Sequence, residues 1–396
     1  MRLGSANAYD NALENLLTRQ SELSSQQERL TSGKRVNRPS DDPTAAAVAE
    51  RALTRITRVA TEQRALDVQR NAIAMAESTL GDAGELSQKI RELVLTASNG
   101  GYNPTNRTTI ANQIRGLRDQ LFSLANRTDS NGIPLFGGLG SSGTPFTDAT
   151  TGIVFNGIAG QRASTEITLP GAMDGQAIWM AVPTGNGTFN VALGGANTGS
   201  AWATQGQVVS PAAVTGDNYS VTFTVAAGVT TYDVVDTTTS ATIASGQPYV
   251  SGQTIQFDGM SFVASGAPAN GDVLQLSAST QTNVFKVLDD AIASINNAPG
   301  DNRLSHAVAL ALNQIDASMD RIQSARGQAG DWLNRGDTIE NSQKGRTIQL
   351  TADKAKAEDM DMVKGISDFE KLNTGYQAAL QSYAKVQNLS LFNFIN

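Results

Sequence analysis

The chain has 396 residues, and its 30 Lys and Arg against 37 Asp and Glu give a formal net charge of −7. It has no cysteine, which excludes disulfides and thiolate metal sites, and its one histidine, His306, excludes a site built on paired histidines. A mildly acidic chain without a basic run matches neither nucleic acid nor a membrane surface, so we expect neither as a partner.

Charged residues are distributed unevenly along the chain. Between Gly138 and Gln281 there is no lysine and a single arginine, Arg162, and Gly, Ser, Thr, Ala and Val dominate. The flanking segments 1–137 and 282–396 hold nearly all the Lys, Arg and Glu. The sequence therefore predicts two charged arms around a charge-poor insert.

The first 33 residues have the periodicity of a helix with a narrow apolar seam. The seam positions alternate by three and four residues, as in a heptad repeat, and comprise Tyr9, Leu13, Leu16, Gln20, Leu23, Gln27 and Leu30. Ser32 and Gly33 then form a natural stop, with Gly33 in the left-handed position after the helix. A basic turn with Lys34, Arg35 and Arg38 follows.

A second helix is expected over residues 43–97, with Asp42 as its cap and Pro43 in its first turn. Such a helix would measure about 80 Å at 1.5 Å per residue, which fits a rod better than a compact domain. A turn at 98–104 precedes a third helix with apolar positions between Ile110 and Leu124, which should return along the second.

The insert has the alternation of β-strands at 219–225, 232–235 and 254–257, and Asp258-Gly259 is a hairpin turn signal. A weaker strand pattern involves Ile153, Phe155, Ile167 and Leu169.

Helical periodicity returns in the C-terminal arm. One helix is expected around 285–295, and a long one from Leu304 to about Leu350, followed by a polar, Ala/Lys-rich connector. Asp359 and Asp361 can cap a terminal helix that begins near Met362. The last residues are apolar and aromatic, which is unusual for a free terminus and predicts a partner surface. The resulting candidate assembly residues are Leu13, Leu16, Leu23, Leu30, Leu389, Leu391, Phe392 and Phe394.

No group of residues predicts catalysis, a metal site or a cofactor. His306 lacks partners for nucleophilic chemistry and is expected to be an ordinary helix residue. Glu358, Asp359 and Asp361 are better explained as the start of a helix than as an acidic site. We interpret the basic turn at Lys34 as a solvated turn or a contact between subunits.

Gln27–Asn37, followed by Asp41-Asp42, resembles the N-terminal signature of the bacterial flagellin family. Both arms match in order as well as in motif. Within that family, three features resemble the proteins of the hook–filament junction: Pro43 after the Asp pair, Leu135-Phe136-Gly137-Gly138 at the end of the first arm, and the ending Tyr383–Asn393. The insert carries no family signal.

The resemblance implies a structural subunit of the extracellular bacterial flagellum and not an enzyme. It implies export through the flagellar type III apparatus with a chaperone and without a cleavable signal peptide. It also implies a homo-oligomeric ring that joins the hook, through hook-associated protein 1, to the flagellin filament. The alternatives are a flagellin-like filament subunit, which would form long polymers, and an enzyme with a carbohydrate-active insert, which would need converging carboxylates.

The predicted fold is mainly α with a β-rich insert, in which the two arms form a long antiparallel helical rod. Residues 1–42 and 360–396 are expected to pair as an inner coiled-coil layer. Residues 43–138 and 282–359 are expected to form a helical bundle, and residues 139–281 an outer β-rich domain.

Overall fold

The computed structural model describes residues 2–99, 102–141, 143–150, 152–297 and 302–392. The chain forms two compact units, one of residues 1–64 with 339–396 and the other of residues 65–338. The predicted domain boundaries near residues 42, 138, 281 and 359 stay predictions.

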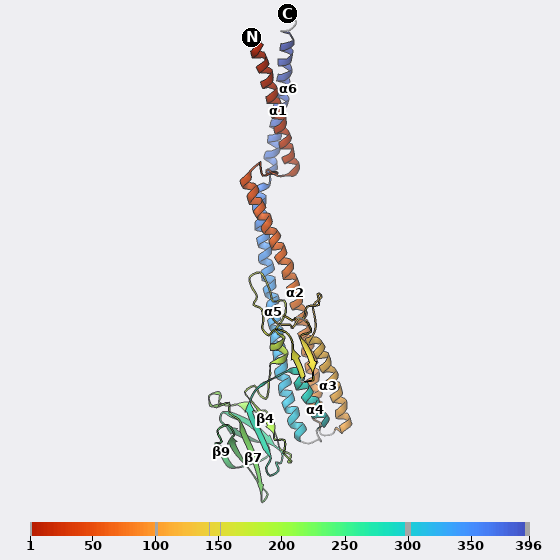
Figure 1. Ribbon diagram of the computed structural model, residues 1–396, viewed down its shortest axis with the longest axis vertical. Coiled ribbons are helices and arrows are strands. Elements are labelled where there is room, and N and C mark those ends of the chain that lie inside the picture. The colour runs from red at the N-terminus through yellow and green to blue at the C-terminus, as the bar shows by residue number, and fades with distance from the viewer. Residues whose placement is uncertain (1, 100–101, 142, 151, 298–301, 393–396) are drawn as a thin grey trace. The chain divides into compact units, whose positions relative to one another are not determined.

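The helical arms are as the sequence predicts, with one difference in length (Figure 1). The long helices are α1 (Arg2–Ser32), α2 (Pro43–Ala97), α3 (Pro104–Ala125), α4 (Val284–Asn297), α5 (Asn302–Glu358) and α6 (Met362–Phe392). Helix α5 does not end near Leu350, because the expected connector is itself helical. The connector, residues 351–358, is rich in Ala and Lys, which are strong helix formers, and contains no Gly or Pro.

The predicted helix boundaries have the expected local chemistry. Gly33 has a φ of 69°, the left-handed conformation that ends α1. The Ala45 amide donates to Oδ1 of Asp42 at 3.0 Å, which caps α2, and the Val363 amide donates to Oδ1 of Asp361 at 3.0 Å, which caps α6.

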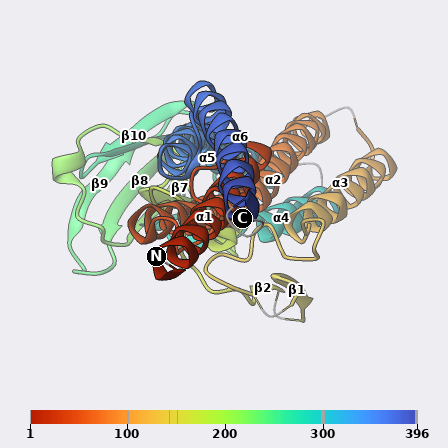
Figure 2. The same cartoon turned by 90° about the horizontal axis from the view of Figure 1, so that it is seen from above.

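In the unit of residues 65–338, α2 and α5 run antiparallel. Arg70 pairs with Asp337, Glu77 with Arg326, and Arg91 with Asp316, so the residue number rises along one helix as it falls along the other. Helices α3 and α4 lie side by side (Figure 2). The predicted apolar stripes of α2 and α4 are buried, including Leu66, Ile73, Leu80, Phe285 and Ile292.

An aromatic cluster forms the core where the insert leaves the helices. Phe285 of α4 contacts Phe146 and Trp179, with ring centroids 6.4 and 6.2 Å apart. The Phe136 ring meets Trp179 edge-on at 5.6 Å. Gly138 follows with a φ of 67°, where a Cβ atom would collide with the carbonyl oxygen of Ile158. This explains why Phe136 and two glycines stand together at the end of the first arm.

The insert is an antiparallel β structure. Its strands are β1 (Phe146–Ala149), β2 (Gly152–Phe155), β3 (Val182–Pro183), β4 (Phe189–Leu193), β5 (Trp202–Ala203), β6 (Gln207–Val208), β7 (Tyr219–Ala226), β8 (Val229–Asp236), β9 (Thr242–Pro248), β10 (Gln253–Phe257), β11 (Met260–Ser265), β12 (Val273–Ala278) and β13 (Gln281–Thr282). The three clearer predicted strands are confirmed as β7, β8 and β10. Of the weaker pattern, Ile153 and Phe155 lie in β2, whereas Ile167 and Leu169 lie in no strand.

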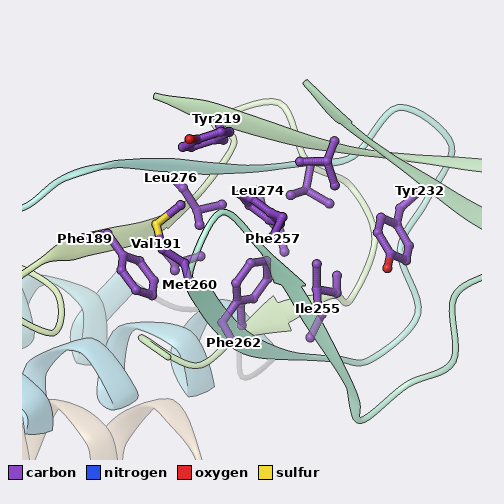
Figure 3. Packing of buried hydrophobic residues seen from close by; sticks show 14 of the residues in the cluster. Phe189, Val191, Tyr219, Tyr232, Ile255, Phe257, Met260, Phe262, Leu274 and Leu276 are labelled. Atoms are coloured by element: carbon purple, nitrogen blue, oxygen red, sulfur yellow. The ribbon is translucent and has the colours of Figure 1, made fainter. Parts of the chain in front are cut away.

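Two sheets of the insert enclose one apolar core (Figure 3). One sheet has the order β4-β12-β7-β8-β9, and in the other β11 pairs with β10 on one side and with β5 and β6 on the other. The β10–β11 hairpin turns at Asp258 and Gly259, which have φ angles of 41° and 75°, as this dipeptide predicts. The apolar core between the two sheets includes the side chains of Tyr219, Phe223 and Phe262.

The start of α5 holds the insert through backbone carbonyl groups. Nδ1 of His306 lies 2.8 Å from the Ala203 oxygen, and the Arg303 guanidinium donates to the Asn197 oxygen. Burial lowers the pKa of His306, and the carbonyl groups of Ala203 and Val191 oppose that effect only in part. His306 is therefore a neutral core residue, as expected from the sequence.

Candidate assembly surface

Helices α1 and α6 pair antiparallel in the unit of residues 1–64 and 339–396 (Figure 1). The Gln26 side chain donates from Nε2 to the Gly365 carbonyl oxygen at 3.0 Å. Toward the other end, the Tyr383 hydroxyl donates to the Tyr9 hydroxyl at 2.6 Å, and the ring centroids are 5.5 Å apart. These contacts fix the register of the pair.

Two glycines of α6 let α1 approach closely. A Cβ atom at Gly375 would lie 2.8 Å from Nη1 of Arg19, and one at Gly365 would lie 3.2 Å from a methyl carbon of Leu30. The two glycines therefore leave room for the side chains of Arg19 and Leu30 against α6.

Apolar burial is almost absent from this pair. Among the described side chains of α1 and α6, the only buried residues are Gln26 and Gly365. At least a third of the side chain remains exposed at Tyr9, Leu13, Leu17, Met362, Val363, Ile366 and Leu380. An unburied apolar face of this kind marks an interaction surface.

The predicted assembly residues fall into two groups, those in α1, whose side chains are described, and those near the C-terminus, whose side chains are not. Leu13 is 37% exposed, and Leu16, Leu23 and Leu30 are half-buried. Leu389, Leu391 and Phe392 belong to α6, but their side chains lie outside the described residues, as does the whole of Phe394. The glutamines of the predicted seam, Gln20 and Gln27, are exposed, and Gln26 takes the buried position instead.

The heptad pattern misses the two most exposed large apolar side chains among the described residues of the pair. Leu17 is 56% exposed and Val363 is 82% exposed, and neither is a predicted seam residue. The signal that identifies them is an apolar residue outside the heptad positions. A soluble two-helix pair has no use for such a residue unless a further surface covers it.

The basic turn after α1 is tied to the end of α5 within the same chain. The Arg35 amide donates to the Glu358 carbonyl oxygen at 2.7 Å, and the Met360 amide to the Gly33 oxygen at 3.0 Å. Nζ of Lys34 lies 3.2 Å from Oε1 of Glu358. The turn is solvated at Lys34, whose side chain is 42% exposed while it pairs with Glu358. A contact between subunits at this turn stays a prediction.

Carboxylates in this turn are held in the charged form. Hydrogen bonds from the Arg38 and Asn37 amides lower the pKa of Asp41. The Ala45 amide and then the Arg35 guanidinium lower the pKa of Asp42. Burial alone would raise the pKa of Glu358, but Lys34 and Lys354 together lower it. These polar interactions hold the turn between α1 and α2 against the end of α5.

No group of three or more His, Cys, Asp or Glu side chains in the described part of the chain is placed to hold a metal ion. Within the same residues, no helix combines the length and apolar character needed to cross a membrane.

Comparison with known proteins assigns the helical arms. Residues 5–141 match the family model of the bacterial flagellin N-terminal helical region. Flagellar hook-associated protein 3 of Escherichia coli K12 is 23% identical over 99% of both chains. The crystal structure of hook-associated protein 3 from Legionella pneumophila, 28% identical, has a TM-score of 0.71 over 76% of this chain and 97% of that one.

The match of the N-terminal arm and the structural match over 76% of the chain both agree with the resemblance to the bacterial flagellin family. The chain's mainly α fold with a β-rich insert is that of this family, as predicted. Flagellin of Bacillus subtilis is 31% identical, but over only 35% of this chain and 46% of its own length. The family members named here are structural flagellar proteins rather than enzymes.

Proposed function

We propose that this chain is a structural subunit of the bacterial flagellum that joins the hook to the flagellin filament. The observation that carries the proposal is the exposed apolar surface of α1 and α6, which needs neighbouring subunits to cover it. The match to a hook-associated protein over the full length of both chains supports a junction role over a filament role.

The partners follow from this role. Copies of the chain form a ring through the terminal helices, with hook-associated protein 1 on one side and flagellin on the other. The chain reaches the extracellular flagellum through the flagellar export apparatus with a chaperone. The absence of cysteine suits passage from a reducing to an oxidising compartment.

Flagellin itself is the second candidate, and the shorter match to Bacillus subtilis flagellin is its support. A filament subunit polymerises without limit, whereas a junction subunit adds a limited layer.

The test is electron microscopy of a strain that lacks this protein. We expect hooks without filaments, with flagellin released into the medium, because nothing retains flagellin on the hook. A strain that loses flagellin altogether, or a purified chain that forms long filaments by itself, contradicts the junction role and supports the alternative.

Variants of the deletion strain test the surface. Leu17→Ser with Val363→Ser, and separately Phe392→Ala with Phe394→Ala, should be exported at normal levels and yet fail to retain filaments. Val229→Ser is the matched control, because Val229 is 61% exposed but lies in the insert. Normal swarming by both double variants, with secretion checked by immunoblot, contradicts the role of these residues.

A further inference from the structure

A cleft lies between the outer face of one insert sheet and helix α5, within the unit of residues 65–338. Its volume is about 470 Å³.

 The lining comes from the loop between β5 and β6, from strands β6, β10 and β11, and from helix α5. It comprises Thr204, Gln205, Gly206, Gln207, Thr254, Ser261, Phe262, Val263, Ala309 and Asn313.

The pleat of the sheet explains why this face is polar. Ile255 of β10 and Phe262 of β11 point into the core of the insert. Their neighbours in sequence therefore point outward, toward α5. Thr254 pairs with Val263, and Ser261 pairs with Gln207, so these side chains form adjacent rows on the outer face.

Four of the lining side chains have unused hydrogen-bonding capacity. Among the described residues, no hydrogen bond involves the side chains of Gln207, Thr254, Ser261 or Asn313. Gln207 and Thr254 are exposed and Asn313 is partly exposed, whereas Ser261 is 4% exposed. Hydroxyl and carboxamide groups that face a cleft without a partner in the fold are free to hydrogen-bond a ligand.

The other two polar side chains of the cleft are engaged within the fold. The Val263 amide donates to Oγ1 of Thr204 at 3.1 Å, and the Gln205 carboxamide makes two hydrogen bonds to the backbone of Val191. These contacts fix the wall of the cleft and leave the four free groups as its recognition elements.

No charged side chain lines the cleft. A charged ligand would lose water there without gaining an opposite charge, whereas hydroxyl groups can both donate to and accept from amides and hydroxyls. The volume lies in the range of about 300–1,000 Å³ that is typical of small-molecule sites. The absence of a lining carboxylate leaves no group for acid–base hydrolysis, so the site suits binding alone.

We propose that this cleft binds a neutral, hydroxyl-rich ligand of the chemical class of simple saccharides, through Gln207, Thr254, Ser261 and Asn313. The inference does not depend on the junction role, because it rests on residues other than those of the terminal helices, which carry that role.

Saturation-transfer-difference NMR on the full chain tests the proposal with glucose, galactose, N-acetylglucosamine and trehalose as probes. Glucuronic acid and glucosamine are the charged counterparts. We expect at least one neutral sugar to give a saturable signal and the charged sugars to bind at least tenfold more weakly. Gln207→Ala with Asn313→Ala should weaken binding of the neutral sugar at least tenfold.

Gln256→Ala is the matched control, because Gln256 is an exposed glutamine on β10 that does not line the cleft. It should leave binding unchanged, and circular dichroism should show the same fold in all variants. No signal from any neutral sugar, equal binding of charged sugars, or equal losses in Gln256→Ala and the double variant each overturn the proposal.

Discussion

The terminal helices and the helices of residues 65–338 share one sequence pattern but differ in burial. Leu66, Ile73 and Leu80 follow the heptad of α2 and are fully buried. Leu16, Leu23 and Leu30 follow the heptad of α1 and are only half-buried. The heptad therefore predicts a helix with an apolar face, but the number of neighbouring elements decides whether that face is covered.

The difference has an energetic consequence. Full burial of a large aliphatic side chain stabilises a fold by about 1.5–3 kcal/mol. The described part of the α1–α6 pair gains little of this in a single chain, whereas the helices of the other unit gain it repeatedly. We infer that the terminal pair reaches full stability only when other subunits cover it.

The largest expected effect is the difference in melting temperature between a shorter and a longer deletion of the insert. Replacing residues 185–279 with a short Gly/Ser linker should leave the helical bundle intact, because Thr184 and Thr280 are joined by a backbone hydrogen bond of 2.8 Å. Replacing 141–279 also removes Phe146 and Trp179, which contact Phe285, and should destabilise the bundle. Circular dichroism melting compares the two, and equal melting temperatures contradict this account of the core.

A point substitution sharpens the comparison of burial. Phe285→Ala should cost about 3–5 kcal/mol of unfolding free energy, because it empties a buried aromatic site. Leu17→Ala should change the monomer by less than about 0.5 kcal/mol, because its side chain is 56% exposed. Chemical denaturation of both variants is the measurement. A cost above 2 kcal/mol for Leu17→Ala shows that the monomer already buries that face.

A smaller effect is expected at the root of the insert. Gly138→Ala should cost about 1–3 kcal/mol, because Gly138 has a positive φ and its Cβ would collide with the backbone of Ile158. Gly132→Ala is the control, since Gly132 has a φ of 78° but open space around it. The difference between the two variants in chemical denaturation isolates the collision, and equal costs contradict it.

Sequence reasoning succeeded where structure is local and failed where it depends on distant segments. Helix periodicity, the Asp42 and Asp361 caps and the Asp258-Gly259 turn are all local, and all are confirmed. The sheet order was not predictable, because β4 pairs with β12 across most of the insert. At the surface, the heptad found Leu13 but not Val363, since exposure depends on neighbours that the sequence does not name.

His306 and the carboxylates of the turn after α1 should lose their contributions to stability in different pH ranges. The pKa of His306 is lowered in the fold, so the unfolded chain binds more protons and stability falls as the pH drops below about 6.5. The pKa values of Asp41, Asp42 and Glu358 are also lowered, but their contribution is lost only as the pH falls below about 4.5.

Thermal unfolding between pH 8 and pH 5 measures the first effect. His306→Gln should reduce the loss of stability between pH 7 and pH 5 while leaving the loss below pH 4.5 in place. An unchanged profile between pH 7 and pH 5 contradicts a role for His306 in this range.

Hydrogen exchange of the verified monomer and of the assembled flagellar junction tests the central claim most directly. We expect residues 7–30 and 362–385 to exchange rapidly in the monomer and slowly in the assembly, while residues 65–97 are protected in both. Strong protection of the two terminal segments in the monomer would contradict the account, because their apolar faces would then be covered without any neighbouring subunit.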